Sequence, residues 1–112
     1  AGVPPEIMGI GPIKAIPKVL SLTGIKQDDL DWIELNEAFA SQSLACIKDL
    51  NIDPHKVNID GGAIALGHPL GATGARITAK AAQILKREKK KYALATQCIG
   101  LGQGIATILE SY

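Results

Sequence analysis

Three short segments of this 112-residue chain combine side chains capable of acid–base chemistry with small residues that leave the backbone accessible. They are Asn36-Glu37-Ala38-Phe39, the glycine-rich stretch around His68, and Cys98-Ile99-Gly100-Leu101-Gly102-Gln103-Gly104. An amide can hold a carbonyl oxygen, an imidazole can move a proton near neutral pH, and a thiol can act as a nucleophile or a base. We therefore take Asn36, His68 and Cys98 as candidate site residues.

Asn36 stands where a predicted strand over 32–35 meets a predicted helix over 37–50. Ligand-binding groups gather at such strand ends in α/β folds. Two interpretations stay open at this point. Either Asn36 caps the helix, as asparagine commonly does, or its amide holds a water molecule or a carbonyl oxygen.

His68 lies in a segment with five glycines in fourteen positions, from Gly61 to Gly74, just before a predicted helix. Glycines let the backbone approach a ligand closely. The segment lacks the Gly-Lys-Ser/Thr ending of a phosphate-binding P-loop, and its glycine spacing is not that of a dinucleotide fold. An imidazole held rigidly between Gly67 and Pro69 suits proton transfer or hydrogen-bond donation, although a purely structural histidine is the alternative.

Cys98 ends a predicted strand and is followed by three alternating glycines, whose N–H groups could receive a developing oxyanion. Cys46 lies on the apolar side of a predicted helix, so we expect it to be an inert buried thiol. The cysteines and histidines share no zinc-like pair spacing, so we expect no metal site. Gly100-x-Gly102-x-Gly104 also differs from the dinucleotide fingerprint.

Helices and strands alternate along the chain, which predicts a single α/β domain over residues 1–112. The predicted helices span about 14–22, 37–50 and 71–87, and the predicted strands span 32–35, 58–65, 92–98 and 104–111. We expect the cluster Lys86-Arg87-Glu88-Lys89-Lys90-Lys91 to be a solvated helix end, where cations suit the negative end of the dipole. A contact with phosphate or another polyanion is the alternative for this cluster.

The composition excludes several classes of protein. A formal net charge of +1 argues against a nucleic-acid partner, and two cysteines are too few for a disulfide framework. No apolar run approaches the ~20 residues that span a bilayer, so we expect no membrane partner. An apolar content of 46% is ordinary for a folded globular protein.

Together the three segments resemble the thiolase family. The family's motifs occur here in its order and spacing: Asn-Glu-Ala-Phe, then Asn-x-x-Gly-Gly-x-Ile-Ala-Leu-Gly-His-Pro-x-Gly-x-Thr-Gly-x-Arg, then Cys-x-Gly-x-Gly-x-Gly. Met8-Gly9-Ile10-Gly11-Pro12 also looks like the family's linker into its first helix. The resemblance covers essentially the whole chain, and the histidine motif is highly specific.

The resemblance implies a role for each candidate residue. His68 matches the histidine that activates the nucleophile and helps to hold the thioester oxygen, and Asn36 matches the asparagine that orients a water in the same oxyanion hole. Cys98 matches the cysteine that adds or removes the α-proton of acetyl-CoA. Gly100 matches the residue whose N–H binds the oxyanion of the other tetrahedral step. We also expect His68 to tune the pKa of the Cys98 thiol.

The resemblance further implies a thiolase carboxy-terminal half, with a mixed β-sheet flanked by helices. We expect the domain to be incomplete at its start, with Ala1-Gly2-Val3 as the trailing end of a lost central strand, and the isolated chain to associate through the unpaired edges. The acyl-carrying cysteine belongs to the missing amino-terminal half, so the chain alone should be inactive. The full-length protein should form a homo-oligomer, a dimer or a tetramer.

The implied reaction is acyl transfer between coenzyme A and a 3-ketoacyl-CoA or acetyl-CoA carbon, with coenzyme A thioesters as substrates and no tightly bound cofactor. Leu101 and Gln103 favour the 3-ketoacyl-CoA thiolases of fatty acid β-oxidation over acetoacetyl-CoA-forming enzymes. A non-catalytic lipid- or CoA-binding relative, or a decarboxylating condensing enzyme, is the alternative outside this group. The expected compartment is the cytoplasm of a bacterium, or the mitochondrion or peroxisome of a eukaryote.

Overall fold

A three-stranded mixed sheet forms the centre of the domain in the computed structural model, which describes all 112 residues. The strands are β1 (Trp32–Leu35), β2 (Tyr92–Ile99) and β3 (Gln103–Glu110), in the order β1-β2-β3. β1 runs parallel to β2, and β3 returns antiparallel to β2. The predicted α/β class and mixed sheet are therefore confirmed.

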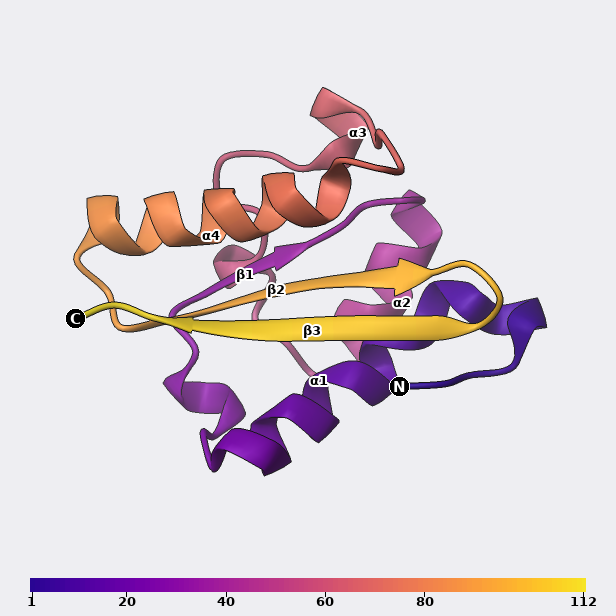
Figure 1. Cartoon of the computed structure of the whole chain (residues 1–112), viewed down its shortest axis with the longest axis horizontal. Helices are drawn as coiled ribbons and strands as arrows, with labels where there is room; N and C mark the ends of the chain where they lie inside the picture. Colours follow the sequence, from indigo (N-terminus) through magenta and orange to yellow (C-terminus); the bar gives the residue numbers. More distant parts are fainter.

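Helices cover both faces of this sheet (Figure 1). α4 (Thr73–Glu88) lies on one face, while α1 (Gly11–Thr23) and α2 (Ala40–Asp49) lie on the other. Side chains of β2 alternate between the two layers, because successive residues of a strand point to opposite faces. Ala93 and Ala95 pack against α4, whereas Leu94 packs in the core on the side of α1 and α2.

The predicted strand over 58–65 is wrong. One parallel bridge joins Val57 to Ile33, after which the chain turns and forms the short helix α3 (Ala63–Leu66). Asn58 and Gly61 have φ values of +49° and +86°, which end an extended strand. The Asn58 side chain bonds the backbone of Leu35 in place of a further strand ladder.

The first residues of the chain lie along the outer edge of β3, and not in the middle of the sheet as we predicted. Gly2 forms an antiparallel bridge with Gln103, and the Val3 N–H donates to the Gly102 carbonyl at 2.8 Å. The prediction of a central strand and of two facing unpaired edges is therefore wrong. Most of the outer edge of β3 lacks a partner strand in this structure.

The helices on the α1 side depart from the prediction in their bounds and faces. α1 begins at Gly11, so Pro17 lies inside it and frees one carbonyl of the preceding turn. α2 begins at Ala40 and buries Gln42, Ser43 and Cys46. Phe39 and Leu44 are mostly exposed, although their apolar character and helical spacing favour a place in the core. No helix of the structure has the length and apolarity that crossing a membrane requires.

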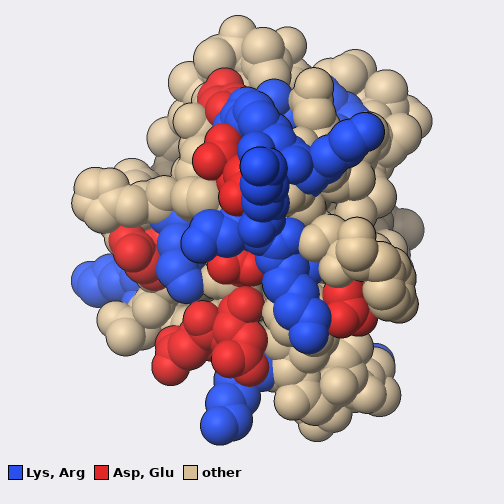
Figure 2. Space-filling model, turned by 90° about the vertical axis from the view of Figure 1, so that its left-hand side faces the viewer, with Lys and Arg blue, Asp and Glu red and all other residues tan.

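Three of the five cations in the basic cluster at the end of α4 form ion pairs with carboxylates. Figure 2 shows acidic side chains interspersed with the lysines and arginines on this end of the molecule. Arg87 pairs with Asp60 and with Glu88, both at 2.7 Å, Lys91 pairs with Glu110 at 3.5 Å, and Lys90 lies 3.9 Å from Asp31. This arrangement favours the solvated helix end over a polyanion contact.

The start of α1 touches β3 at two facing glycines, Gly11 and Gly104. A Cβ atom at Gly104 would overlap the Gly11 backbone, which has no flexible side chain that could move away. We expect Gly104→Ala to lower the free energy of unfolding by about 3 kcal/mol or more, because the helix must shift to make room. Urea denaturation measures this, with Gly2→Ala as the control because its Cβ would meet nothing within 4 Å.

Candidate active site

The His68 imidazole is held by one side chain at each ring nitrogen. Its Nδ1 lies 2.7 Å from Oγ1 of Thr73, the first residue of α4. Its Nε2 lies 3.4 Å from Nδ2 of Asn36, directly after β1. The loop before α4 and the end of β1 are thus joined through one half-buried imidazole.

These contacts assign the tautomer of His68. The Thr73 hydroxyl donates its only hydrogen to the Pro69 carbonyl at 3.0 Å, so its oxygen accepts from His68 Nδ1–H. Nε2 then carries the lone pair and accepts from the Asn36 amide. In this arrangement Nε2 is the ring nitrogen that can take a proton from a thiol.

Asn36 does not cap a helix, because α2 begins four residues later and Phe39 occupies the N-cap position. The capping interpretation is therefore wrong. Asn36 is 1% exposed, its N–H donates to the Thr96 carbonyl of β2 at 3.0 Å, and its Oδ1 has no partner in the chain. The alternative interpretation, an amide that serves a bound molecule, stays a prediction.

Glu37 and Asn58 hold the loop that carries His68. Asn58 Oδ1 accepts from the Leu35 N–H at 2.9 Å, and its Nδ2 donates to the Leu35 carbonyl at 2.8 Å and to Glu37 at 3.0 Å. The second carboxylate oxygen of Glu37 accepts from the Ile64 N–H at 2.9 Å. Sequence reasoning missed both of these positioning roles and that of Thr73, although all three residues belong to the motifs it quoted.

His68, Cys98 and Gly100 line one cavity of about 820 Å³. The structure thus brings three of the four predicted site residues to a single space, and Asn36 reaches it through His68. Met8, Phe39 and Leu70 supply apolar side chains to the same cavity, and all three are substantially exposed. A cavity with an apolar lining and a few polar groups suits a ligand with an acyl or alkyl portion.

Cys98 and Gly100 differ in what they offer to this cavity. Burial raises the pKa of the Cys98 thiol above its ordinary value, and the residue's own backbone only partly opposes this. A thiol with a raised pKa holds its proton at neutral pH, and the tuning that we expected from His68 stays a prediction. The Gly100 N–H makes no hydrogen bond within the chain, so it is free to donate to a ligand.

The sequence model of the family described as "Thiolase, C-terminal domain" matches residues 1–111. The chain belongs to the thiolase family, as its carboxy-terminal domain. It is 52% identical to a 3-ketoacyl-CoA thiolase of Bacillus subtilis over 109 residues, and 55% identical to the mitochondrial 3-ketoacyl-CoA thiolase of Bos taurus over 111 residues. These alignments cover 97% and 99% of this chain but only 28% of each relative.

Solved thiolase structures have the same fold as this domain. The crystal structure of human mitochondrial 3-ketoacyl-CoA thiolase superimposes with a TM-score of 0.98 at 52% identity. The acetyl-CoA acetyltransferase of Bacillus anthracis also gives a TM-score of 0.98, at 47% identity. Each match covers 100% of this chain and 28% of the solved chain. The thiolase domain therefore spans little more than a quarter of its relatives' length.

The thiolase domain also buries a titratable glutamate next to this site. Glu34 of β1 is 2% exposed, and burial raises its pKa from 4.5 to about 7, with Arg76 and Lys80 opposing the rise only in part. Between these two values the folded state keeps a proton that the unfolded state has lost. The proton on Glu34 therefore stabilises the folded state fully below about pH 4.5, and this contribution is lost as the pH rises through 7.

We expect the free energy of unfolding to fall by about 3 kcal/mol over that pH range because of Glu34 alone. Urea denaturation at about pH 4.5 and about pH 8 measures the change, and Glu34→Gln should remove most of it. An equally steep loss of stability in Glu34→Gln would show that other groups are responsible.

Proposed function

We propose that this domain works within a longer protein as the carboxy-terminal catalytic part of a 3-ketoacyl-CoA thiolase. The proposal depends on one observation above all: His68 and Cys98, far apart in the chain, line the same cavity. The names of the relatives and the crystal structure of the human mitochondrial enzyme in complex with CoA support coenzyme A thioesters as substrates. We propose no tightly bound cofactor.

In the proposed cleavage, His68 Nε2 takes the proton of a nucleophilic cysteine that lies outside this chain. The resulting thiolate attacks the 3-keto carbon, and the bond between C2 and C3 then breaks. The two electrons of that bond leave with C2 as the enolate of acetyl-CoA, and Cys98 donates its proton to this carbon. The thiol of coenzyme A then gives its proton to the Cys98 thiolate and takes the acyl group. The nucleophilic cysteine regains its proton from His68, which completes a ping-pong cycle.

The hydrogen-bonding groups of the site suit the charges that develop in these steps. Developing oxyanions are stabilised best by fixed donors in a site with little water. We propose that Asn36, through a bound water, and His68 serve the thioester oxygen, and that the Gly100 N–H serves the oxygen of the other tetrahedral step. The raised pKa of Cys98 fits a thiol that begins this direction of the reaction as an acid.

The test is an assay of a full-length protein that contains this domain. We expect cleavage of 3-ketoacyl-CoA by coenzyme A, with acetyl-CoA as one product, and no turnover by residues 1–112 alone. The fully buried Cys46 cannot replace the missing nucleophile. Absence of activity in the full-length protein, or turnover by the isolated domain, would contradict the proposal.

A biosynthetic acetoacetyl-CoA thiolase is the second candidate, because the domain is also 47% identical to an acetyl-CoA acetyltransferase. Rates with acetoacetyl-CoA and with a long-chain 3-ketoacyl-CoA distinguish the two candidates. We further propose that the full-length protein is a homodimer or homotetramer. Its relatives include bacterial and mitochondrial proteins, so we propose the bacterial cytoplasm or the mitochondrion or peroxisome as its compartment.

A further inference from the structure

The buried Glu34 of β1 and the half-buried Arg76 of α4 attract each other without forming a direct ion pair. Glu34 of β1 is 2% exposed, and its Oε1 has no hydrogen-bond partner. Nε and Nη2 of Arg76, on α4, are also buried without partners. Among the charges around Glu34, Arg76 exerts the strongest attraction. Unpartnered buried charges are costly, so their presence here calls for a reason other than stability.

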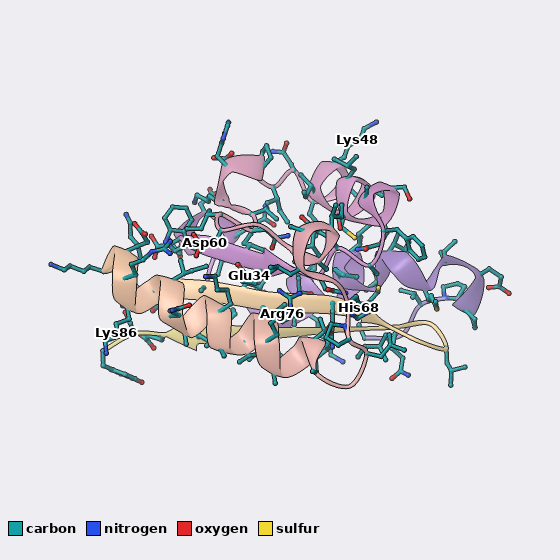
Figure 3. All side chains as sticks on the ribbon, turned by 90° about the horizontal axis from the view of Figure 1, so that it is seen from above. Glu34, Lys48, Asp60, His68, Arg76 and Lys86 are labelled. Carbon is teal, nitrogen blue, oxygen red and sulfur yellow. The ribbon has the colours of Figure 1, made fainter.

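This pair lies directly beside the two groups that hold His68. Glu34 is two residues before Asn36 and therefore points to the same face of β1. Arg76 is three residues after Thr73, which places it one helical turn further along the same side of α4. Figure 3 shows Asp60, Glu34, Arg76 and His68 one after another along the length of α4.

We propose that Glu34 and Arg76 are positioning residues that hold the start of α4 against the end of β1. Their attraction keeps Thr73 and Asn36 at the spacing that orients the His68 imidazole between them. The inference rests on the proposed thiolase function of His68. Burying the ionised Glu34 costs free energy of folding, so the pair does not stabilise the domain. We therefore assign to Glu34 and Arg76 the role of orienting His68.

The other charges around Glu34 leave Arg76 as its main partner. Lys80, also on α4, is engaged by Asp60 at 2.6 Å, and Asp60 and Glu37 repel the carboxylate. Burial raises the pKa of Glu34 to about 7, so the carboxylate gains its charge as the pH rises through neutrality. The attraction to Arg76 is therefore strongest above pH 7, and turnover should rise with this ionisation.

The experiment compares Glu34→Gln, Arg76→Gln and the double variant in a full-length protein that contains this domain. We expect each single variant to lower kcat by about tenfold to a hundredfold, with KM nearly unchanged, because misplacement of a catalytic group has effects of this size. The double variant should lose no more than one single variant does, because both changes remove the same pairwise contact. Glu88→Gln, on the exposed end of α4, is the matched control and should leave kcat unaltered.

Two readouts separate orientation from a structural role. Above pH 7, Glu34→Gln should be at least as stable to urea as the wild type and yet have a lower kcat. Its kcat should also lack the rise near pH 7 that the wild type shows. The 15N signals of the His68 ring, assigned with a His68→Asn variant, should shift in both single variants.

The proposal is overturned if the fold-losses in kcat of the two single variants multiply in the double variant. It is also overturned if both single variants keep the kcat and the His68 ring signals of the wild type. If the wild type itself lacks acyl transfer, the proposed function fails. The ring signals still decide whether Glu34 and Arg76 orient His68 in that case.

Discussion

Replacing His68 by asparagine in a full-length protein that contains this domain is expected to lower kcat by about a thousandfold or more. The change removes the basic Nε2 that takes the proton of the nucleophilic cysteine, and it removes one donor to the thioester oxygen. The fold should persist, because asparagine can still bond Thr73. Steady-state cleavage of acetoacetyl-CoA by coenzyme A measures the effect.

His55 provides the matched control for this variant. It is the only other histidine of the domain, it is exposed, and it lies outside the cavity. His55→Asn should leave kcat within about twofold of the wild type, as expected for a surface substitution. A similar loss of activity in both variants, or none in His68→Asn, would remove His68 from the mechanism.

Replacing Cys98 by serine is expected to lower kcat by a similar factor, about a thousandfold, through a different step. A serine hydroxyl is far less acidic than a thiol, so it exchanges a proton with the α-carbon poorly at neutral pH. Acyl transfer from an acyl-CoA to the nucleophilic cysteine does not require that proton and should continue. Mass spectrometry of the trapped acyl-enzyme separates the two steps.

Cys46→Ala is the control, because this thiol is fully buried among α2 and core residues and does not line the cavity. We expect it to form the acyl-enzyme and to complete turnover under conditions where it is folded. If Cys98→Ser instead fails to form the acyl-enzyme, Cys98 acts earlier than the mechanism assumes.

Much of the sheet could be predicted from local sequence patterns. The strands over 32–35, 92–98 and 104–111 agree with β1, β2 and β3 to within about a residue, because apolar runs bounded by turn residues mark strands well. The segment over 58–65 shares that apolar character, but the left-handed Asn58 ends the strand. Apolar character predicts the buried face of α2 only in part: Ile47 packs against the core, but Gln42 and Ser43 are buried while Leu44 is exposed.

The site shows the same division between local and long-range information. A rare histidine between glycine and proline, and a thiol before alternating glycines, are visible in the sequence, and the structure brings both to one cavity. The groups that orient them depend on contacts between distant segments. Glu37 meets Asn58 across 21 positions and Ile64 across 27, and no local pattern predicts such pairs.

Exchange of the methyl hydrogens of acetyl-CoA with solvent deuterium tests the central claim most directly, because it follows proton transfer at the α-carbon without any bond to a second acyl group. In a full-length protein that contains this domain, we predict exchange by the wild type, seen as loss of the methyl proton signal. We predict its loss in both Cys98→Ser and His68→Asn, since one residue moves the proton and the other stabilises the enolate. Exchange at the wild-type rate in Cys98→Ser would contradict the account.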